Sequence, residues 1–331
     1  MRSAEAFPNL EKLDIGWFSS LALPPLSTSL KKLKKLKCGS LNLASLSSKL
    51  ETLTDLTVHF TNTCKCITVE TLESLANLKK LEIWEADERS LPEEGMRALK
   101  SLTSLSVNYC RKLMGGLPQG WLRHLTALEE LDIFQCDGVV ELPDEVRYLK
   151  FLAKVELKSL PKMVYLLKAL QHLSSSLQCL FLSTLCEQSS LPEWLGDFTS
   201  LEELTISECP KVTSLPTRIR GMTNLQFMLV MECPELERRC EREIGEDWHN
   251  IQHIPHLVPD GDFDDEFRTE YDKQYNEYED PNMCFDVPQD TPKTSEDHSQ
   301  YYNRVFGNRR DKLKVEKIKM KKVPLQISQF Q

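Results

Sequence analysis

The chain has 331 residues, with 41 Lys and Arg against 50 Asp and Glu, so its formal net charge at pH 7 is −9. This charge argues against general binding to nucleic acids or anionic membranes, because phosphate groups would repel the protein. The sequence has no run of about 18 apolar residues and no apolar segment at its N-terminus, so we expect neither a membrane span nor a secretory signal.

A leucine-spaced unit recurs ten times between residues 7 and 236, with the pattern L-x-x-L-x-L and apolar substitutes. Successive units begin 20 to 26 residues apart, which is the period of a repeat architecture. The last two apolar residues of each unit alternate with polar ones, so each unit should contain a short strand with one buried face. The ten units start at Leu10, Leu33, Leu53, Leu78, Leu102, Leu128, Leu152, Leu177, Leu201 and Leu225.

These units predict an α/β leucine-rich-repeat solenoid, or horseshoe, over residues 1–240. One unit cannot bury its apolar face alone, whereas stacked units form a continuous core and a parallel sheet on the concave side. Parallel neighbours need a return crossover, which the remaining residues of each unit supply.

Leu-Pro pairs recur in the predicted return segments. Proline fixes φ and lacks an N–H, so it ends a strand and can open a helical turn. We therefore expect short helices or irregular turns on the convex side. The pairs are Leu91-Pro92, Leu117-Pro118, Leu142-Pro143, Leu191-Pro192 and Leu215-Pro216.

Cysteine follows four of the predicted strands, at Cys110, Cys136, Cys209 and Cys233. Many repeats of this kind have Asn in this place, bonded to the backbone of the turn. A thiol is small and a weak donor, so we expect these side chains to fill the core mainly by packing, with no metal or redox role. The eleven cysteines are odd in number and form no spaced framework, and no glycosylation acceptor occurs. Together these features favour a reducing, cytoplasmic setting.

The strand residues that alternate with the buried ones should line the concave face and bind a protein. Four of them are aromatic, and aromatic side chains exposed on a rigid sheet are good interface anchors. The alternative is that their rings fold onto neighbours and contact no partner. The candidate binding residues are Lys37, Lys80, Glu82, Trp84, Ser106, Asn108, Asp132, Phe134, Glu156, Phe181, Thr205 and Phe227.

The C-terminal part of the repeat region resembles that of plant nucleotide-binding leucine-rich-repeat disease-resistance proteins of the coiled-coil class. The resemblance rests on SLPEWLGDFTSLEELTISECPKVTSLPTRIRGMTNLQ and on the closing string CPELERRCEREIGEDWHNIQHIPHL. Within the closing string, the residues that match the family are Cys233-Pro234, Leu236, Arg239-Cys240, Gly245, Asp247-Trp248 and Ile254-Pro255. The likeness is close over residues 185–257 and looser, but in register, back to residue 7.

The resemblance implies plant defence: a repeat region that senses a pathogen effector or a guarded host protein, and that restrains a nucleotide switch. The phosphate loop of that switch, G-x-x-x-x-G-K-[ST], does not occur in this sequence, so we expect no nucleotide or other cofactor. A switch domain on another chain is a further possible partner. Because the chain begins directly in a repeat, we expect a fragment, a truncated product or a partner that covers this end.

Residues 241–258 should form a C-terminal cap, in which Trp248 packs over the last repeat. His249, His253 and His256 lie close together in this segment, but no carboxylate sits where a metalloprotease would need it. We expect no metal site there, no catalytic residues elsewhere and no enzyme activity.

We expect residues 259–331 to form a disordered tail, because an acidic block at residues 260–280 and a basic block at residues 309–322 follow one another in a segment of low hydrophobicity. The basic block, residues 309–322, leaves nuclear import open, although nucleic-acid binding is not favoured. Alternative functions are an intracellular scaffold or adaptor and an inactive truncated decoy. An extracellular receptor ectodomain is a further alternative, but the missing secretory signal and the missing glycosylation sites argue against it.

Overall fold

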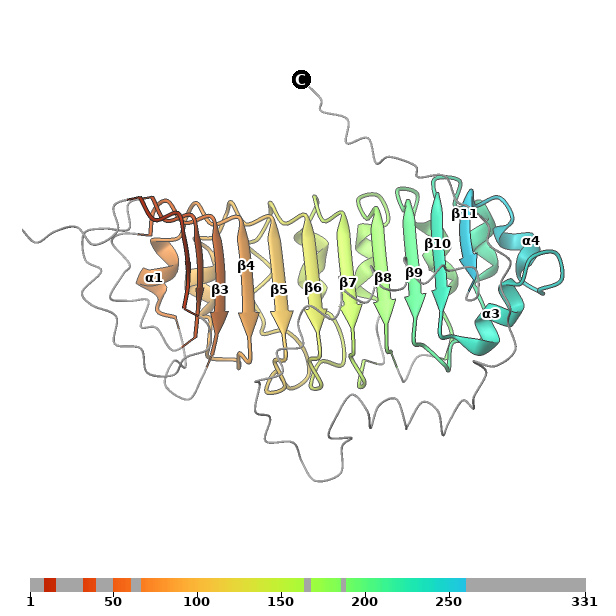
Figure 1. The fold of residues 1–331 in the computed structure, drawn as a ribbon, viewed down its shortest axis with the longest axis horizontal. Coiled ribbons are helices and arrows are strands. Elements are labelled where there is room, and N and C mark those ends of the chain that lie inside the picture. Colours follow the sequence, from red (N-terminus) through yellow and green to blue (C-terminus); the bar gives the residue numbers. More distant parts are fainter. Residues whose placement is uncertain are drawn as a thin grey trace, which may run out of the picture. The chain divides into compact units, whose positions relative to one another are not determined.

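In the part of the chain that the structure describes, eleven parallel strands lie side by side in the order of the sequence and form one open sheet (Figure 1). Ten of them confirm the ten strands predicted from the leucine spacing. The strands are β1 (Lys12–Asp14), β2 (Lys35–Cys38), β3 (Asp55–His59), β4 (Lys80–Trp84), β5 (Ser104–Asn108), β6 (Glu130–Phe134), β7 (Lys154–Lys158), β8 (Cys179–Ser183), β9 (Glu203–Ser207), β10 (Phe227–Met231) and β11 (His256–Pro259).

The computed structural model describes residues 9–15, 32–39, 50–60, 67–163, 168–185 and 189–259. The chain falls into two units, Met1–Asp265 and Glu266–Gln331, and every described residue belongs to the first. The predicted tail, apart from Pro259, therefore lies outside the described residues. None of the described helices is long and apolar enough to cross a membrane.

The register of the sheet aligns the same motif position from strand to strand. Leu81 of β4 pairs with Leu56 of β3 and with Leu105 of β5, and this alignment continues through every strand. The second and fourth residues of the interior strands are buried, as Leu81 and Ile83 illustrate. Stacking like on like in this way builds the continuous core that the repeat predicts.

Short helices cover the return side of the sheet, as the Leu-Pro pairs predict. Proline immediately precedes four of them and adopts extended backbone angles there, so that the helical turn begins at the next residue. The helices of this side are α1 (Val69–Glu73), α2 (Glu93–Met96), η2 (Asp144–Tyr148), η3 (Ala169–Leu173), η4 (Glu193–Asp197) and η5 (Thr217–Gly221).

The residue after each strand from β4 to β10 adopts the left-handed conformation, with φ between 49° and 56°. After β4 to β9, its N–H donates to the carbonyl of the last residue of the next strand, as Glu85 does to Asn108 at 3.0 Å. The leucine pattern did not predict this turn, because non-glycine residues occupy it throughout. The seven residues are Glu85, Tyr109, Gln135, Ser159, Thr184, Glu208 and Glu232.

The four cysteines that follow strands are buried, and their thiols do more than fill space. The Sγ of Cys110 accepts a hydrogen bond from the N–H of Ala86 at 3.2 Å, and that of Cys233 accepts from the N–H of Cys209 at 3.3 Å. The Sγ of Cys136 donates to the carbonyl of Phe134 at 3.4 Å. Thus the thiols satisfy buried backbone groups of adjacent turns, which is the task expected of Asn in this place.

The C-terminal end consists of α3 (Pro234–Cys240), α4 (Trp248–Ile251) and β11, which pairs with β10. Trp248 packs against the core, as predicted. The sheet nevertheless continues into this segment, since β11 adds a strand that the ten-unit pattern did not include.

Candidate functional site

The concave face is the strand face that alternates with the buried core positions. All twelve candidate binding residues belong to this face, and the sheet register brings them into rows. One row crosses the third residue of successive strands, and it runs from Glu82 through Ser106, Asp132, Glu156, Phe181 and Thr205. Their binding role stays a prediction.

Two of the four predicted aromatic anchors are not exposed. Trp84 is 3% exposed and Phe181 is 5% exposed, so the expectation that these rings project into solvent is wrong. Phe134 and Phe227 are half-buried. Trp84 and Phe134 pack on Tyr109, so the apolar part of the concave face from β4 to β6 is a packed layer.

An aromatic column crosses β4, β5 and β6. The ring of Trp84 stacks on that of Tyr109, with centroids 5.2 Å apart and planes 14° apart, and Tyr109 meets Phe134 edge-on at 5.2 Å. The indole N–H of Trp84 donates to Oε1 of Glu82 at 2.8 Å, while Thr57 donates to the other carboxylate oxygen at 3.2 Å. This network fixes the rotamer of Trp84 and leaves it little freedom to lose on binding.

Tyr109 was not among the predicted residues, because it follows β5 and does not belong to it. Its left-handed backbone, with φ of 54°, places its ring between the rings of Trp84 and Phe134. An aromatic residue directly after a strand was the signal available in the sequence.

A charged cluster lies next to this column, on β6 and β7. The ammonium of Lys158 is 2.7 Å from Oε2 of Glu156 and 3.2 Å from Oδ1 of Asp132. Lys154 contacts the other oxygen of Glu156 at 2.7 Å. The Lys158 ammonium also lies 5.9 Å and 5.8 Å from the ring centroids of Phe134 and Phe181. Lys158 thus connects the charged and aromatic parts of the concave face.

Lys158 is not one of the twelve candidates, although the alternation along its strand places it on the same outward face. It pairs with Phe134 across β6 and β7, so it occupies the same outward row as that ring.

The two carboxyl groups of this cluster have opposite pKa shifts. Burial raises the pKa of Asp132 to about 6, because the attraction of Lys158 does not offset the loss of water and the repulsion from Glu156. Burial also opposes ionisation of Glu156, but its contacts with Lys158 and Lys154 prevail and lower its pKa. Asp132 is therefore the group of the cluster that changes charge near neutral pH.

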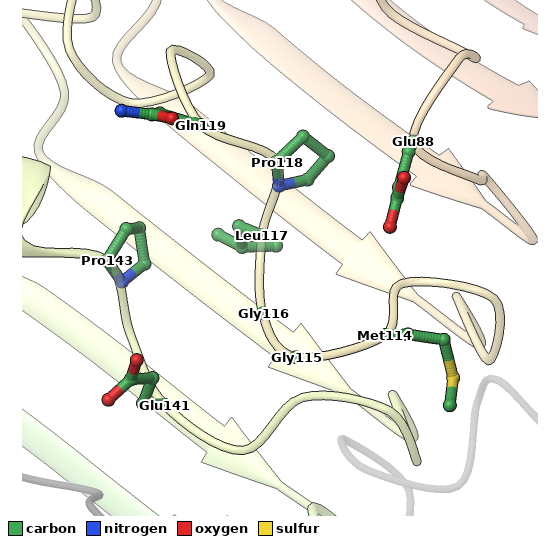
Figure 2. Close-up of a pocket in the computed structure, with 9 residues that line it drawn as sticks. All are labelled: Glu88, Met114, Gly115, Gly116, Leu117, Pro118, Gln119, Glu141 and Pro143. Carbon is green, nitrogen blue, oxygen red and sulfur yellow. The ribbon is translucent and has the colours of Figure 1, made fainter.

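A second feature is a hollow among the loops that follow β4, β5 and β6, with a volume of about 460 Å³ (Figure 2). The loop after β5 supplies six of the nine lining residues and is joined to the next loop by a bridge between Gly115 and Val139. The hollow is lined by Glu88, Met114, Gly115, Gly116, Leu117, Pro118, Gln119, Glu141 and Pro143.

Among the described residues, no group of three or more His, Cys, Asp or Glu is placed to hold a metal ion. In the histidine-rich closing segment, Nε2 of His253 lies 3.3 Å from the carbonyl of Met222.

Comparison with known proteins supports the repeat architecture. Residues 88–234, which include β5 to β10, match the family described as plant disease resistance protein RPS2-like, leucine-rich repeats. No curated protein matches the chain.

Among solved structures, the chain is similar to a leucine-rich-repeat protein of Leptospira interrogans, with a TM-score of 0.56 and 22% identity over 76% of this chain. The chain spans 61% of the length of that protein. The leucine-rich-repeat domain of the type III effector XopL matches with a TM-score of 0.48 and 21% identity, over 65% of this chain and 71% of that one. The chain thus carries a leucine-rich-repeat solenoid, and residues 88–234 are similar to the repeats of plant disease-resistance proteins.

Proposed function

We propose that the chain is a non-enzymatic recognition module of plant defence, which binds a pathogen effector or a guarded host protein through its concave face. The observation that carries the proposal is the joined aromatic column and charged cluster of β4 to β8. The match of residues 88–234 to plant resistance repeats supports the defence role.

The column and the cluster provide the chemistry of a protein interface. Aromatic side chains are enriched at the centre of such interfaces, whereas charged groups at the rim guide association and orientation. Here the half-buried ring of Phe134 lies beside Lys158 and packs edge-on against the buried ring of Tyr109, and all three residues belong to strands or turns that the core supports. Preorganised groups of this kind lose little freedom on binding.

Exposed charged residues lie around the aromatic column and the charged cluster. Reversing their charges tests whether the concave face binds the partner. Lys80, Glu130 and Glu203 are exposed first residues of β4, β6 and β9. A triple variant, Lys80→Glu with Glu130→Lys and Glu203→Lys, reverses three charges of the concave face without touching the core. A matched variant, Glu73→Lys with Glu94→Lys and Lys100→Glu, makes the same charge change on the helical side.

The wild-type chain, the concave variant and the helical-side variant are used as baits in extracts of infected and uninfected leaves. Binding of each captured protein to the three baits is then measured with purified components. We expect a protein that the wild-type chain and the helical-side variant bind equally, and that the concave variant binds at least tenfold more weakly. A partner that remains bound to the concave variant, or that is lost from both variants alike, contradicts recognition through this face.

A further inference from the structure

We propose that the hollow of Figure 2 is a second binding site, for an extended peptide in which a Lys or Arg stands beside an apolar residue. The site lies among the loops that follow the strands, so it is separate from the concave face and does not depend on the function proposed for that face.

The apolar part of the hollow is open to solvent. Met114 is 67% exposed, which makes it one of three large hydrophobic residues that the described chain leaves exposed. Leu117, Pro118 and Pro143 provide further apolar lining (Figure 2). A flexible, polarizable Met side chain at the border of a hollow suits contact with apolar side chains of varied shape.

Two carboxylates make the hollow selective for a cation. Glu88 and Glu141 border it from opposite sides in Figure 2, and both are exposed. Within the described part of the chain, neither forms a hydrogen bond or an ion pair. Residues 87–94 and 137–145, which contain them, hold eight acidic residues and one basic residue, while the loop between them carries Arg111, which pairs with Asp137 at 3.6 Å, and Lys112. A Lys or Arg side chain between Glu88 and Glu141 would therefore find negative charge on both sides.

Two glycines, Gly115 and Gly116, line the hollow with backbone alone. Gly115 has φ of 94°, a conformation that favours glycine, and its N–H donates to the carbonyl of Gly138 at 2.8 Å. At Gly116 a Cβ would lie 3.1 Å from the carbonyl oxygen of Glu141, closer than such atoms ordinarily approach. Gly116 therefore allows the two loops to pack closely, whereas a Cβ at Gly115 would meet nothing within 4 Å, so a ligand can approach the main chain at Gly115.

The size of the hollow favours a peptide over a free ion. A volume of about 460 Å³ is within the range of sites that hold a few side chains or a small molecule. A lone cation would leave Met114 and the prolines uncovered, whereas a basic residue followed by an apolar one covers both kinds of surface.

Fluorescence anisotropy with labelled peptides and the full chain tests the proposal. The probe is Gly-Ser-Lys-Leu-Arg-Leu-Ser-Gly. One comparison peptide has Glu in place of Lys and Arg, and another has Ser in place of both Leu. The site variant is Glu88→Gln with Glu141→Gln, and Met114→Ser tests the apolar contact. The matched control is Glu129→Gln with Glu202→Gln, which removes two exposed carboxylates elsewhere.

We expect the probe to bind with a dissociation constant below 1 mM and both comparison peptides to bind more weakly. The site variant should lose about tenfold in affinity, because two exposed ion pairs together contribute on this scale. Met114→Ser should also weaken binding, and the control should not. In a methyl spectrum of labelled methionines, the signal that Met114→Leu removes should shift when the probe is added.

The proposal fails if the probe does not bind at 1 mM, or if the control weakens binding as much as the site variant does, because attraction would then be general. Spermidine provides a further test, because it carries positive charge but no peptide backbone. The proposal also fails if spermidine displaces the labelled probe as effectively as the unlabelled peptide does at the same concentration of positive charge, since the occupant would then be a polyamine. None of these outcomes bears on the concave face.

Discussion

Arg239 holds the carboxylate of Asp247 with two hydrogen bonds, from Nε to Oδ2 at 2.9 Å and from an η-nitrogen to Oδ1 at 2.8 Å. Asp247 is buried, and its Oδ2 also accepts from the N–H of Leu215 at 3.2 Å. Arg239 lies on α3, Asp247 directly precedes α4, and Leu215 belongs to the preceding repeat. One carboxylate thus ties the closing segment to the solenoid.

Replacing Asp247 with Ala should destabilise the C-terminal end by about 3 kcal/mol, because it leaves Arg239 and the N–H of Leu215 without their partner. Urea unfolding followed by circular dichroism measures the change. Arg238→Ala is the matched control, since Arg238 pairs with Glu235 and Glu246 at an exposed site and should change stability little. If both substitutions lower the free energy of unfolding equally, the Arg239–Asp247 pair contributes no more to stability than an exposed ion pair does.

Gly245→Ala should also loosen this end, for a steric reason. A Cβ at Gly245 would overlap the carbonyl oxygen of Arg239, which is backbone and cannot swing aside. At Gly221, by contrast, a Cβ meets nothing within 4 Å, so Gly221→Ala serves as the control. Hydrogen exchange should show faster exchange over α4 and β11 in the first variant alone; unchanged exchange at β11 would contradict the overlap.

Trp84→Ala should cost about 3 to 5 kcal/mol, because it removes a buried ring, its stacking on Tyr109 and its bond to Glu82. Phe151→Ala should change the free energy of unfolding by less than about 0.5 kcal/mol, since that ring is 68% exposed. Chemical denaturation compares the two. If Trp84→Ala leaves stability unchanged, the ring is a free binding anchor and not part of a packed layer.

The cluster at Lys158 should give stability a pH dependence that Asp132→Asn removes. The pKa of Asp132 is raised from 3.8 to about 6, so the folded state binds its proton more tightly than the unfolded state does. The resulting stabilisation is present below about pH 4 and is lost as the pH rises through 6, with an upper limit of about 3 kcal/mol. The lowered pKa of Glu156 acts in the opposite direction but is present in both proteins.

The variant should therefore gain stability relative to the wild-type chain between about pH 4.5 and pH 7.5. Urea unfolding of both proteins at the two pH values measures this gain. A difference that does not vary with pH would contradict a raised pKa at Asp132.

The buried thiols should resist alkylation in the folded chain. Burial raises the pKa of Cys240 to about 12 and that of Cys110 well above its usual value. At pH 8 only about one Cys240 in ten thousand would then be a thiolate, the reactive form. Iodoacetamide labelling read by peptide mass spectrometry should leave both sites unmodified in buffer and modify both in concentrated urea. Labelling of Cys240 in buffer at the rate of a free thiol would show that the closing segment opens readily.

The sequence determined the repeat, the ten strands and their register, because these depend on spacings within each unit. Residues such as Leu81 and Ile83 are apolar at a period of two, and only one face of a strand can then be buried. The twelve concave residues follow from the same alternation. The closing string also identified Arg239, Gly245 and Asp247. It did not predict the hydrogen bonds between Arg239 and Asp247 or the close approach of Gly245 to the carbonyl of Arg239.

The tertiary structure decided which outward residues are exposed and which are covered. That property depends on neighbours about one repeat away, such as Tyr109 beside Trp84 and Lys158 beside Phe134, which no spacing within a unit specifies. It also decided that the sheet continues into β11, where Ile254 and Leu257 fit the leucine pattern but Pro259 does not. Pro259 has no N–H to donate, so this strand is tolerated only at the edge, where the neighbouring strand β10 supplies the pairing.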